Sequence, residues 1–207
     1  MNNLLPASDE ANLEEGDDRR PPRGPLAITP TITPYTLTLH AGEITERALI
    51  IDTETTGRSL TAEIIEVAVC DISGCILFES LVRPTESVPR AAARIHGLTT
   101  DCLINAPTWY EVWRQLEPVV NCRTLIAYNA PFDRRMVELE CARYRLPAPE
   151  VRWRCAMRFI KEINRWRRAP TLEEACRSYQ ITPGTHRAAS DACATALLLQ
   201  RVLSSSK

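Results

Sequence analysis

The most regular pattern along the chain is a series of short apolar runs that end in turn-forming or acidic residues. Residues 49–51, 64–70 and 76–82 are rich in β-branched and apolar side chains, and residues 71–74 between the last two carry a turn signal. Such runs with short connections predict three antiparallel strands. Residues 123–128 form another run and predict a further strand.

Helical spacing of apolar side chains takes over after the first three runs. Residues 108–111 form a capping box, and Trp109 and Trp113 then share one apolar face of the predicted helix. Their shared face favours a core position for both tryptophans over a role as base-stacking platforms. A second capping box lies at residues 171–174, and residues 192–203 carry the apolar stripe of a last helix. Strands and helices together predict an α/β fold.

The composition is that of a folded protein without a global charge bias. The 207 residues include 25 lysines and arginines and 26 aspartates and glutamates, and 44% of them are hydrophobic. No apolar signal segment stands at the start, and no apolar run is long enough to span a bilayer. The eight cysteines are scattered without a C-x-x-C pair. We therefore expect reduced thiols, no zinc site and a cytoplasmic protein with no membrane partner.

Residues 1–45 differ in composition from the rest of the chain. They combine an acidic run within residues 9–18 with five prolines within residues 21–34. Composition of this kind buries too little apolar surface to offset its ordering entropy. We expect a mostly flexible N-terminal extension over residues 1–45 and a folded domain over residues 46–207. Alternating threonine and apolar residues within residues 26–40 leave open a short edge strand or a docked arm.

The first chemical signal is Asp52-Thr53-Glu54, which directly follows the apolar run of the first strand. Residues two apart on a strand point to the same face, so Asp52 and Glu54 present two carboxylates side by side. Adjacent carboxylates repel each other unless a cation lies between them, and Mg²⁺ or Mn²⁺ suits oxygen ligands. The alternative is a solvated strand end with two ordinary acids. Glu66, inside the second run, could join the acidic site, but a position at the solvated sheet edge or hydrogen-bonded beneath the site is favoured.

Further polar candidates stand where predicted strands and loops lead into helices. Asp133 follows a predicted strand by way of Asn129 and lies in the first turn of a helix, where the helix dipole favours an acid in any case. His186 lies in a loop, and Asp191 lies at the start of the last helix. Taken singly, Asp133 is also explained as a helix-terminal acid and His186 as a capping or turn residue.

Residues 143–168 form the most basic part of the chain. They hold nine basic residues against two acidic ones, with Trp153 and Trp166 among them. Arginines interleaved with aromatic side chains are typical of surfaces that bind phosphates and stack bases. The alternative is a solvated helical face that balances the acidic N-terminal extension.

Three motifs occur in order along the chain: D-x-E at Asp52 and Glu54, N-x-x-F-D from Asn129 to Asp133, and H-x-A-x-x-D from His186 to Asp191. With these motifs the chain resembles the DEDDh family of 3′–5′ exonucleases over residues 48–203, including residues 95–99. The resemblance implies a ribonuclease-H-like fold, with a mixed sheet of three antiparallel strands and further parallel strands flanked by helices.

The resemblance also implies a role for each matching residue. Four acids correspond to ligands of two divalent ions, Mg²⁺ or Mn²⁺: Asp52, Glu54, Asp133 and Asp191. His186 corresponds to the general base that takes a proton from the attacking water, a task that suits imidazole because its pKa lies near neutrality. The residues expected to contact the substrate are Thr53, Thr55, His96, Asn129 and Phe132.

The implied activity is metal-dependent hydrolysis of phosphodiester bonds at the 3′ end of nucleic acid, with release of nucleoside 5′-monophosphates. Single-stranded or frayed DNA is the favoured substrate, in repair or proofreading. Two alternatives stay open: trimming of RNA 3′ ends, where contacts to the 2′-hydroxyl would discriminate, and a nucleic-acid-binding or adaptor module with a vestigial site. An acidic, proline-rich extension replaces the polymerase-binding tail of replicase subunits, which argues against association with a polymerase.

Overall fold

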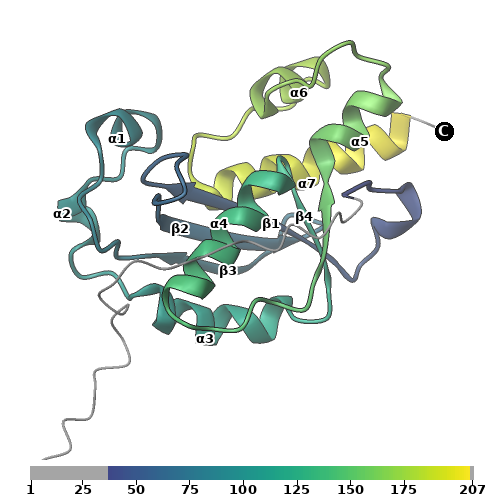
Figure 1. The fold of residues 1–207 in the computed structure, drawn as a ribbon. Coiled ribbons are helices and arrows are strands. Elements are labelled where there is room, and N and C mark those ends of the chain that lie inside the picture. The colour runs from purple at the N-terminus through teal and green to yellow at the C-terminus, as the bar shows by residue number, and fades with distance from the viewer. Residues whose placement is uncertain (1–36, 206–207) are drawn as a thin grey trace, which may run out of the picture.

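The computed structural model describes residues 37–205, which form a mixed sheet with helices on both faces (Figure 1). The order across the sheet is β3-β2-β1-β4-β5. The strands are β1 (Ala48–Thr55), β2 (Ile64–Asp71), β3 (Ile76–Leu81), β4 (Thr124–Ala127) and β5 (Arg152–Cys155). β1, β2 and β3 pair antiparallel, whereas β4 pairs parallel with β1 and with β5. The α/β fold with three antiparallel and further parallel strands is thereby confirmed.

The described residues form seven α-helices, and four of them, which begin at residues 109, 130, 172 and 188, are the helices that the sequence predicts. The seven are α1 (Arg90–His96), α2 (Thr100–Leu103), α3 (Trp109–Val120), α4 (Ala130–Arg143), α5 (Ala156–Ile163), α6 (Leu172–Ser178) and α7 (Ala188–Ser205), preceded by a 3-10 helix at Ala41–Glu43. Both capping boxes are present: Thr108 accepts from the amide of Glu111, and Thr171 accepts from the amide of Glu174. Each cap satisfies an amide that the helix leaves unpaired, so short-range sequence determines where α3 and α6 begin.

The side chains of β1 alternate between two apolar layers. Leu49 and Ile51 belong to the core shared with α3 and α4, and Ala48 and Ile50 belong to the core shared with α5, α6 and α7. Figure 1 shows α4 and α7 on opposite faces of the sheet. Because the alternation continues past the apolar run, Asp52 turns toward the side of α7.

Three of the four tryptophans lie in the core shared with α3 and α4. Trp109 and Trp113 are 0% and 1% exposed, with ring centroids 5.7 Å apart, and their predicted core position is confirmed. Trp153 on β5 is 7% exposed, so its interpretation as a base-stacking platform is wrong. The reason is the alternation of β5, which buries Trp153 and Cys155 and places Arg152 and Arg154 on the other face.

Residues 37–45 pack against the folded domain. Leu39 is 2% exposed and belongs to the core shared with α7. The Arg154 guanidinium binds both carboxylate oxygens of Glu43, with a shortest distance of 2.5 Å. The expected domain boundary between residues 45 and 46 therefore lies within a segment that packs against the domain. Of the alternatives for residues 26–40, a docked arm is present over residues 37–40. The remainder of the expected extension, residues 1–36, lies outside the described residues.

Two expectations about the whole chain concern its cysteines and membranes. All eight cysteines are free thiols, and four of them are buried. Within residues 37–205, no helix combines the length and the apolar character that crossing a bilayer requires. The cytoplasmic location stays a prediction.

Candidate active site

The carboxyl end of β1 brings the two acids of the D-x-E motif beside the start of α7. Asp52 and Glu54 both lie on the strand, and Glu54 pairs across the register with Glu66 of β2. A carboxylate oxygen of Glu54, one of Asp191 and a ring nitrogen of His186 all lie within 4.8 Å of one another. The first and last motifs of the sequence therefore meet at one place.

Asp133 reaches this place from the opposite side of the sheet. It lies in the first turn of α4, is 4% exposed and accepts a hydrogen bond from the Thr53 hydroxyl at 3.0 Å. Thr53 points to the face opposite to Asp52, so the bond ties the start of α4 to β1 between the two D-x-E acids. Burial raises the pKa of Asp133 to about 7, while the hydrogen bond from Thr53 acts against that rise.

Burial and mutual repulsion raise the pKa values of the other acids. Burial raises the pKa of Asp52 well above its usual value, and the charges of Asp133, Asp191 and Glu54 add to the effect. Burial raises the pKa of Glu54 to about 8 together with repulsion from Asp191, whereas the nearby Arg187 acts in the opposite direction. A divalent cation would relieve this repulsion and accept oxygen ligands, so the residues fit the ions that the motifs imply.

Asp191 carries an oxygen that lacks a partner. It lies in the first turn of α7, and its Oδ1 is buried without a hydrogen bond among the described residues. Gly184 lies so close that a Cβ at that position would come within 1.8 Å of this oxygen. Burial raises the pKa of Asp191, and the His186 charge acts against that rise. An unpaired buried carboxylate oxygen costs free energy, which a bound cation would offset.

His186 lies on the loop directly before α7. Its side chain is exposed, and its backbone has a φ of 55°, in the left-handed region that residues other than glycine rarely adopt. Exposure allows the imidazole to exchange protons with water. The position beside Glu54 and Asp191 suits a proton acceptor, and its distances also suit a metal ligand.

His96 ends α1 and is 5% exposed. Its Nδ1 accepts a hydrogen bond from the amide of Leu98 at 3.0 Å, so Nε2 carries the proton of the neutral ring. Burial lowers the pKa of His96, which keeps the ring neutral at pH 7. Nε2 has no partner in hydrogen-bond geometry among the described residues, although the Thr55 backbone is close enough to act on the pKa. The ring therefore bonds within the turn that ends α1, and a buried donor is left over.

The other residues expected to contact the substrate surround the acids. The Thr53 and Thr55 hydroxyls both donate hydrogen bonds within the protein, to the Asp133 carboxylate and to the Gly57 carbonyl. Asn129, the N-cap of α4, is exposed, and Phe132 is half-buried with the Arg135 guanidinium 5.6 Å from its ring centroid. The side chains of Asn129 and Phe132 thus remain for contact with a substrate.

An ion pair between a buried glutamate and a partly exposed arginine lies next to the acids. Glu66 is 1% exposed, and its carboxylate accepts hydrogen bonds from Arg187 and from the amide of Ala188. Of the alternatives for Glu66, hydrogen bonding beneath the site is the one observed. Nothing in the sequence singled out Arg187 or Gly184. The available signals were an arginine directly after the loop histidine and a glycine before it. Neither residue type points to a function by itself, because its contact partner is distant in the sequence or is identified only in the folded structure.

The basic stretch of residues 143–168 divides between the fold and the surface. Arg143 pairs with Glu140, and Arg154 pairs with Glu43. These two arginines are engaged within the protein, so the stretch does not present one continuous phosphate-binding face. Its last residues lie apart from these pairs, in the connection between α5 and α6.

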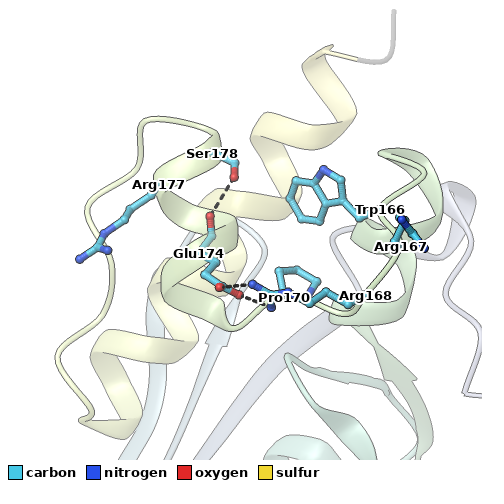
Figure 2. A pocket seen from close by; sticks show the side chains of 7 residues that line it. All are labelled: Trp166, Arg167, Arg168, Pro170, Glu174, Arg177 and Ser178. Atoms are coloured by element: carbon cyan, nitrogen blue, oxygen red, sulfur yellow. Dashed lines mark hydrogen bonds and ion pairs between the residues drawn. The ribbon is translucent and has the colours of Figure 1, made fainter.

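That connection and α6 line an open surface cavity of about 490 Å³ (Figure 2). Its lining residues are Trp166, Arg167, Arg168, Pro170, Glu174, Arg177 and Ser178. Figure 2 shows the Trp166 ring facing α6, with Arg168 bound to Glu174 at 2.5 Å. Exposed ion pairs of this kind are weak and leave an arginine available to other anions. Contact with phosphates and bases stays a prediction, limited to this cavity.

Comparisons with known proteins place the chain in a family. Residues 49–199 match the family model described as Exonuclease, RNase_T. An "Uncharacterized exonuclease" of Escherichia phage 186 is 34% identical over 108 residues, which cover 52% of this chain and 56% of the phage protein. The DNA polymerase III subunit epsilon of Buchnera aphidicola subsp. Schizaphis graminum is 26% identical over 171 residues, which cover 76% of this chain and 73% of the relative.

A similar solved structure is Exonuclease X in complex with 5′ overhanging duplex DNA. It is 28% identical, with a TM-score of 0.60, and the alignment covers 77% of this chain and 93% of that chain. The family model spans well over half of the 207 residues and includes all four motif acids and His186. The chain therefore belongs to the RNase_T family of exonucleases, in its DEDDh group of 3′–5′ exonucleases.

Proposed function

We propose that this protein is a metal-dependent exonuclease that removes nucleotides one at a time from the 3′ end of nucleic acid. The observation that carries the proposal is the convergence of four buried or half-buried acids with one exposed histidine at the end of β1. The acids are Asp52, Glu54, Asp133 and Asp191, and the histidine is His186. Two Mg²⁺ or Mn²⁺ ions are the cofactor that this set of oxygen ligands suits.

The residues of the chain divide between holding ions and moving a proton. The four acids would hold the ions, which when bound stabilise charge on the attacking and leaving oxygens of the phosphodiester. His186 takes a proton from the attacking water as the water oxygen bonds to the last phosphorus atom. The bond from phosphorus to the 3′ oxygen breaks, and that oxygen takes up a proton from solvent. The products are a nucleoside 5′-monophosphate and a strand with a new 3′-hydroxyl.

The terminal nucleotide is assigned to the side chains of His96, Asn129 and Phe132. The neutral His96 would donate from Nε2, its unpaired buried nitrogen, to an oxygen of that nucleotide. The half-buried Phe132 offers a ring face for stacking, and the exposed Asn129 offers an amide. DNA is the favoured substrate because Exonuclease X is described in complex with DNA and the epsilon relative belongs to a DNA polymerase.

The test is an end-labelled oligonucleotide incubated with the full chain and Mg²⁺, as single-stranded DNA and as RNA of matched sequence. We expect stepwise shortening from the 3′ end, release of 5′-mononucleotides, faster cleavage of DNA and complete inhibition by EDTA. Faster cleavage of RNA would favour the second candidate, an exoribonuclease. An oligonucleotide that is bound but never shortened would overturn the proposal in favour of a binding module.

The matched control is the double variant Asp52→Ala/Glu54→Ala. It should be inactive and bind Mn²⁺ more weakly, yet remain folded, because removing both carboxylates relieves the repulsion among the acids. Nuclease activity that survives in a clean preparation of this variant would remove the two acids from the metal site. A change in its circular dichroism spectrum would instead show that the acids are needed for folding.

A further inference from the structure

We infer that Glu66 is a positioning residue that holds His186 beside the four acids by way of Arg187. The inference rests on the proposed function and deepens it, because it adds a residue on β2 to a site built from β1, α4 and α7. Glu66 is not one of the motif acids and is not expected to bind the ions.

The contacts of Glu66 form a clamp on the chain directly after His186. The Nε of Arg187 lies 3.0 Å from both carboxylate oxygens of Glu66, and Nη2 lies 2.5 Å from one of them. The amide of Ala188 donates to the same carboxylate at 2.9 Å. Glu66 is 1% exposed and the Arg187 side chain is 44% exposed, so water reaches the pair only from the side of the arginine. Two consecutive residues are thereby fixed to the centre of the sheet.

His186 is the neighbour that needs such a hold. Its φ of 55° is a sparsely populated conformation for a residue with a side chain, and such conformations persist where the surroundings enforce them. His186 also lies outside α7, in a loop, and its imidazole is exposed. On one side of His186 the Thr185 amide donates to the Ser190 hydroxyl at 3.2 Å, and on the other side the clamp holds the next two residues.

Asp191 depends less on the clamp. It lies inside α7, an 18-residue helix whose apolar side is buried against the sheet. Loss of the clamp should therefore displace His186 while leaving the metal-binding carboxylate near its place. A purely structural ion pair would behave differently, because its loss would lower stability without a selective effect on His186.

The first test uses the fact that the chain has three histidines, at positions 40, 96 and 186. Imidazole signals in a ¹³C-edited NMR spectrum of the metal-free full chain can be assigned with His186→Ala. Glu66→Gln keeps the size of the side chain and removes the bidentate pairing. We expect the His186 signal to move toward the position of a free imidazole. An unchanged His186 signal would overturn the inference.

The matched control is Glu43→Gln, which weakens a second bidentate pair, that with Arg154, away from the acids. It should leave the His186 signal in place. If both variants move the signal equally, the effect is not specific and the inference fails. If Glu66→Gln does not fold, Arg187→Lys replaces it, because lysine keeps the charge beside Glu66 but loses the two-pronged contact. The same selective shift is then expected, and its absence overturns the inference.

The second test is kinetic. Glu66→Gln should lower kcat about 10- to 100-fold, the scale of a misplaced reacting group, with KM and the Kd for Mn²⁺ changed less than about threefold. In the His186→Ala background the same substitution should cause no further loss, because Glu66 acts through His186. Equal losses in both backgrounds would overturn the inference. If the wild-type chain cleaves no oligonucleotide, the proposed function fails, and the NMR result still decides the clamp.

Discussion

Gly184 sets the position of the Asp191 carboxylate. A Cβ on residue 184 would lie 1.8 Å from Oδ1 of Asp191 and 3.0 Å from its Cα, so neither the side chain nor the backbone could stay in place. Gly184→Ala should therefore raise the Kd for Mn²⁺ about tenfold, the scale on which displaced ligands weaken metal binding. Isothermal titration of the full chain with Mn²⁺ measures it. Gly42→Ala is the control, because nothing lies within 4 Å of a Cβ there; equal affinities in the two variants would contradict the prediction.

His186→Ala should lower kcat by roughly 10²- to 10⁴-fold, the usual contribution of a positioned base. Melting temperature and the Kd for Mn²⁺ should stay near wild type, because the four acids remain. A large rise in the Kd would assign His186 as a metal ligand, and a fragile but fast enzyme would make it a turn residue. His186→Gly is a useful second variant: it suits the φ of 55° and should be more stable than the alanine variant by about 1 kcal/mol.

At the scale of elements, β1 positions the site because one of its faces presents acids and the other presents a hydrogen-bond donor. The even-numbered acids face α7, where His186 and Asp191 complete the cluster. Thr53 between them faces α4 and holds Asp133 by its hydroxyl. One strand end thus joins elements that lie on opposite faces of the sheet (Figure 1). A shift of register by one residue would exchange these faces and separate the acids.

The N-terminal segment offers a prediction at the same scale. Removal of residues 1–36 should leave the melting temperature and the turnover of short oligonucleotides unchanged, whereas removal of residues 1–45 should lower the melting temperature. Leu39 is 2% exposed, and burial of such a side chain contributes about 1.5–3 kcal/mol, or roughly 5 °C in a chain of this size. Thermal melts of both truncations and of Leu39→Ala check it. Equal melting temperatures for the two truncations would show that residues 37–45 contribute nothing.

At the scale of the whole molecule, buried acids couple stability to pH. Burial raises the pKa of Glu54 to about 8 and those of Asp133 and Glu140 to about 7. These pKa values exceed those of the same acids in the unfolded chain. At a pH between the unfolded and the folded pKa, the folded state therefore binds more protons, and its stability falls as pH rises. Without metal, the melting temperature should drop between about pH 4 and pH 8. Mg²⁺ or Mn²⁺ should reverse much of the loss above pH 6, because a bound cation favours the ionised acids.

Melting curves in EDTA and in Mg²⁺ across this range test the coupling. Glu140 lies away from the motif acids, pairs with Arg143 and accepts from the amide of Ile64. Glu140→Gln should therefore reduce the pH dependence equally with and without metal, which separates its share from that of the site. A melting temperature that rises with pH in EDTA would refute the expected sign.

Trp166 can report by its fluorescence on binding at the surface cavity. Trp166 lines the cavity of Figure 2 and is half-buried, whereas the other three tryptophans lie in the core. If the cavity contacts the nucleic-acid strand, single-stranded DNA added in EDTA should quench the fluorescence of Trp166, and Trp166→Phe should lose that signal. Arg167→Ala should lower the salt dependence of binding by about one phosphate contact. Binding seen by anisotropy with unchanged fluorescence would favour the solvated-face alternative.

Short-range sequence determined the elements and the chemistry. The capping boxes at Thr108 and Thr171 start helices where a side chain can reach an amide three residues on, and apolar alternation sets the faces of β1. The acids and the histidine were found because their motifs place each on a strand end, a first helical turn or a loop. These signals act within a few residues, so the chain carries them before it folds.

Contacts between distant segments were decided by the tertiary structure alone. Glu66 meets Arg187 because the register of β2 against β1 and the docking of α7 bring them together. Trp153 is a core residue because β5 turns that face toward α4, and Leu39 is buried because the segment before β1 docks beside α7. Each outcome depends on which face of one element covers another, and a local pattern cannot specify the partner. The free energy of such contacts exists only once both surfaces are formed.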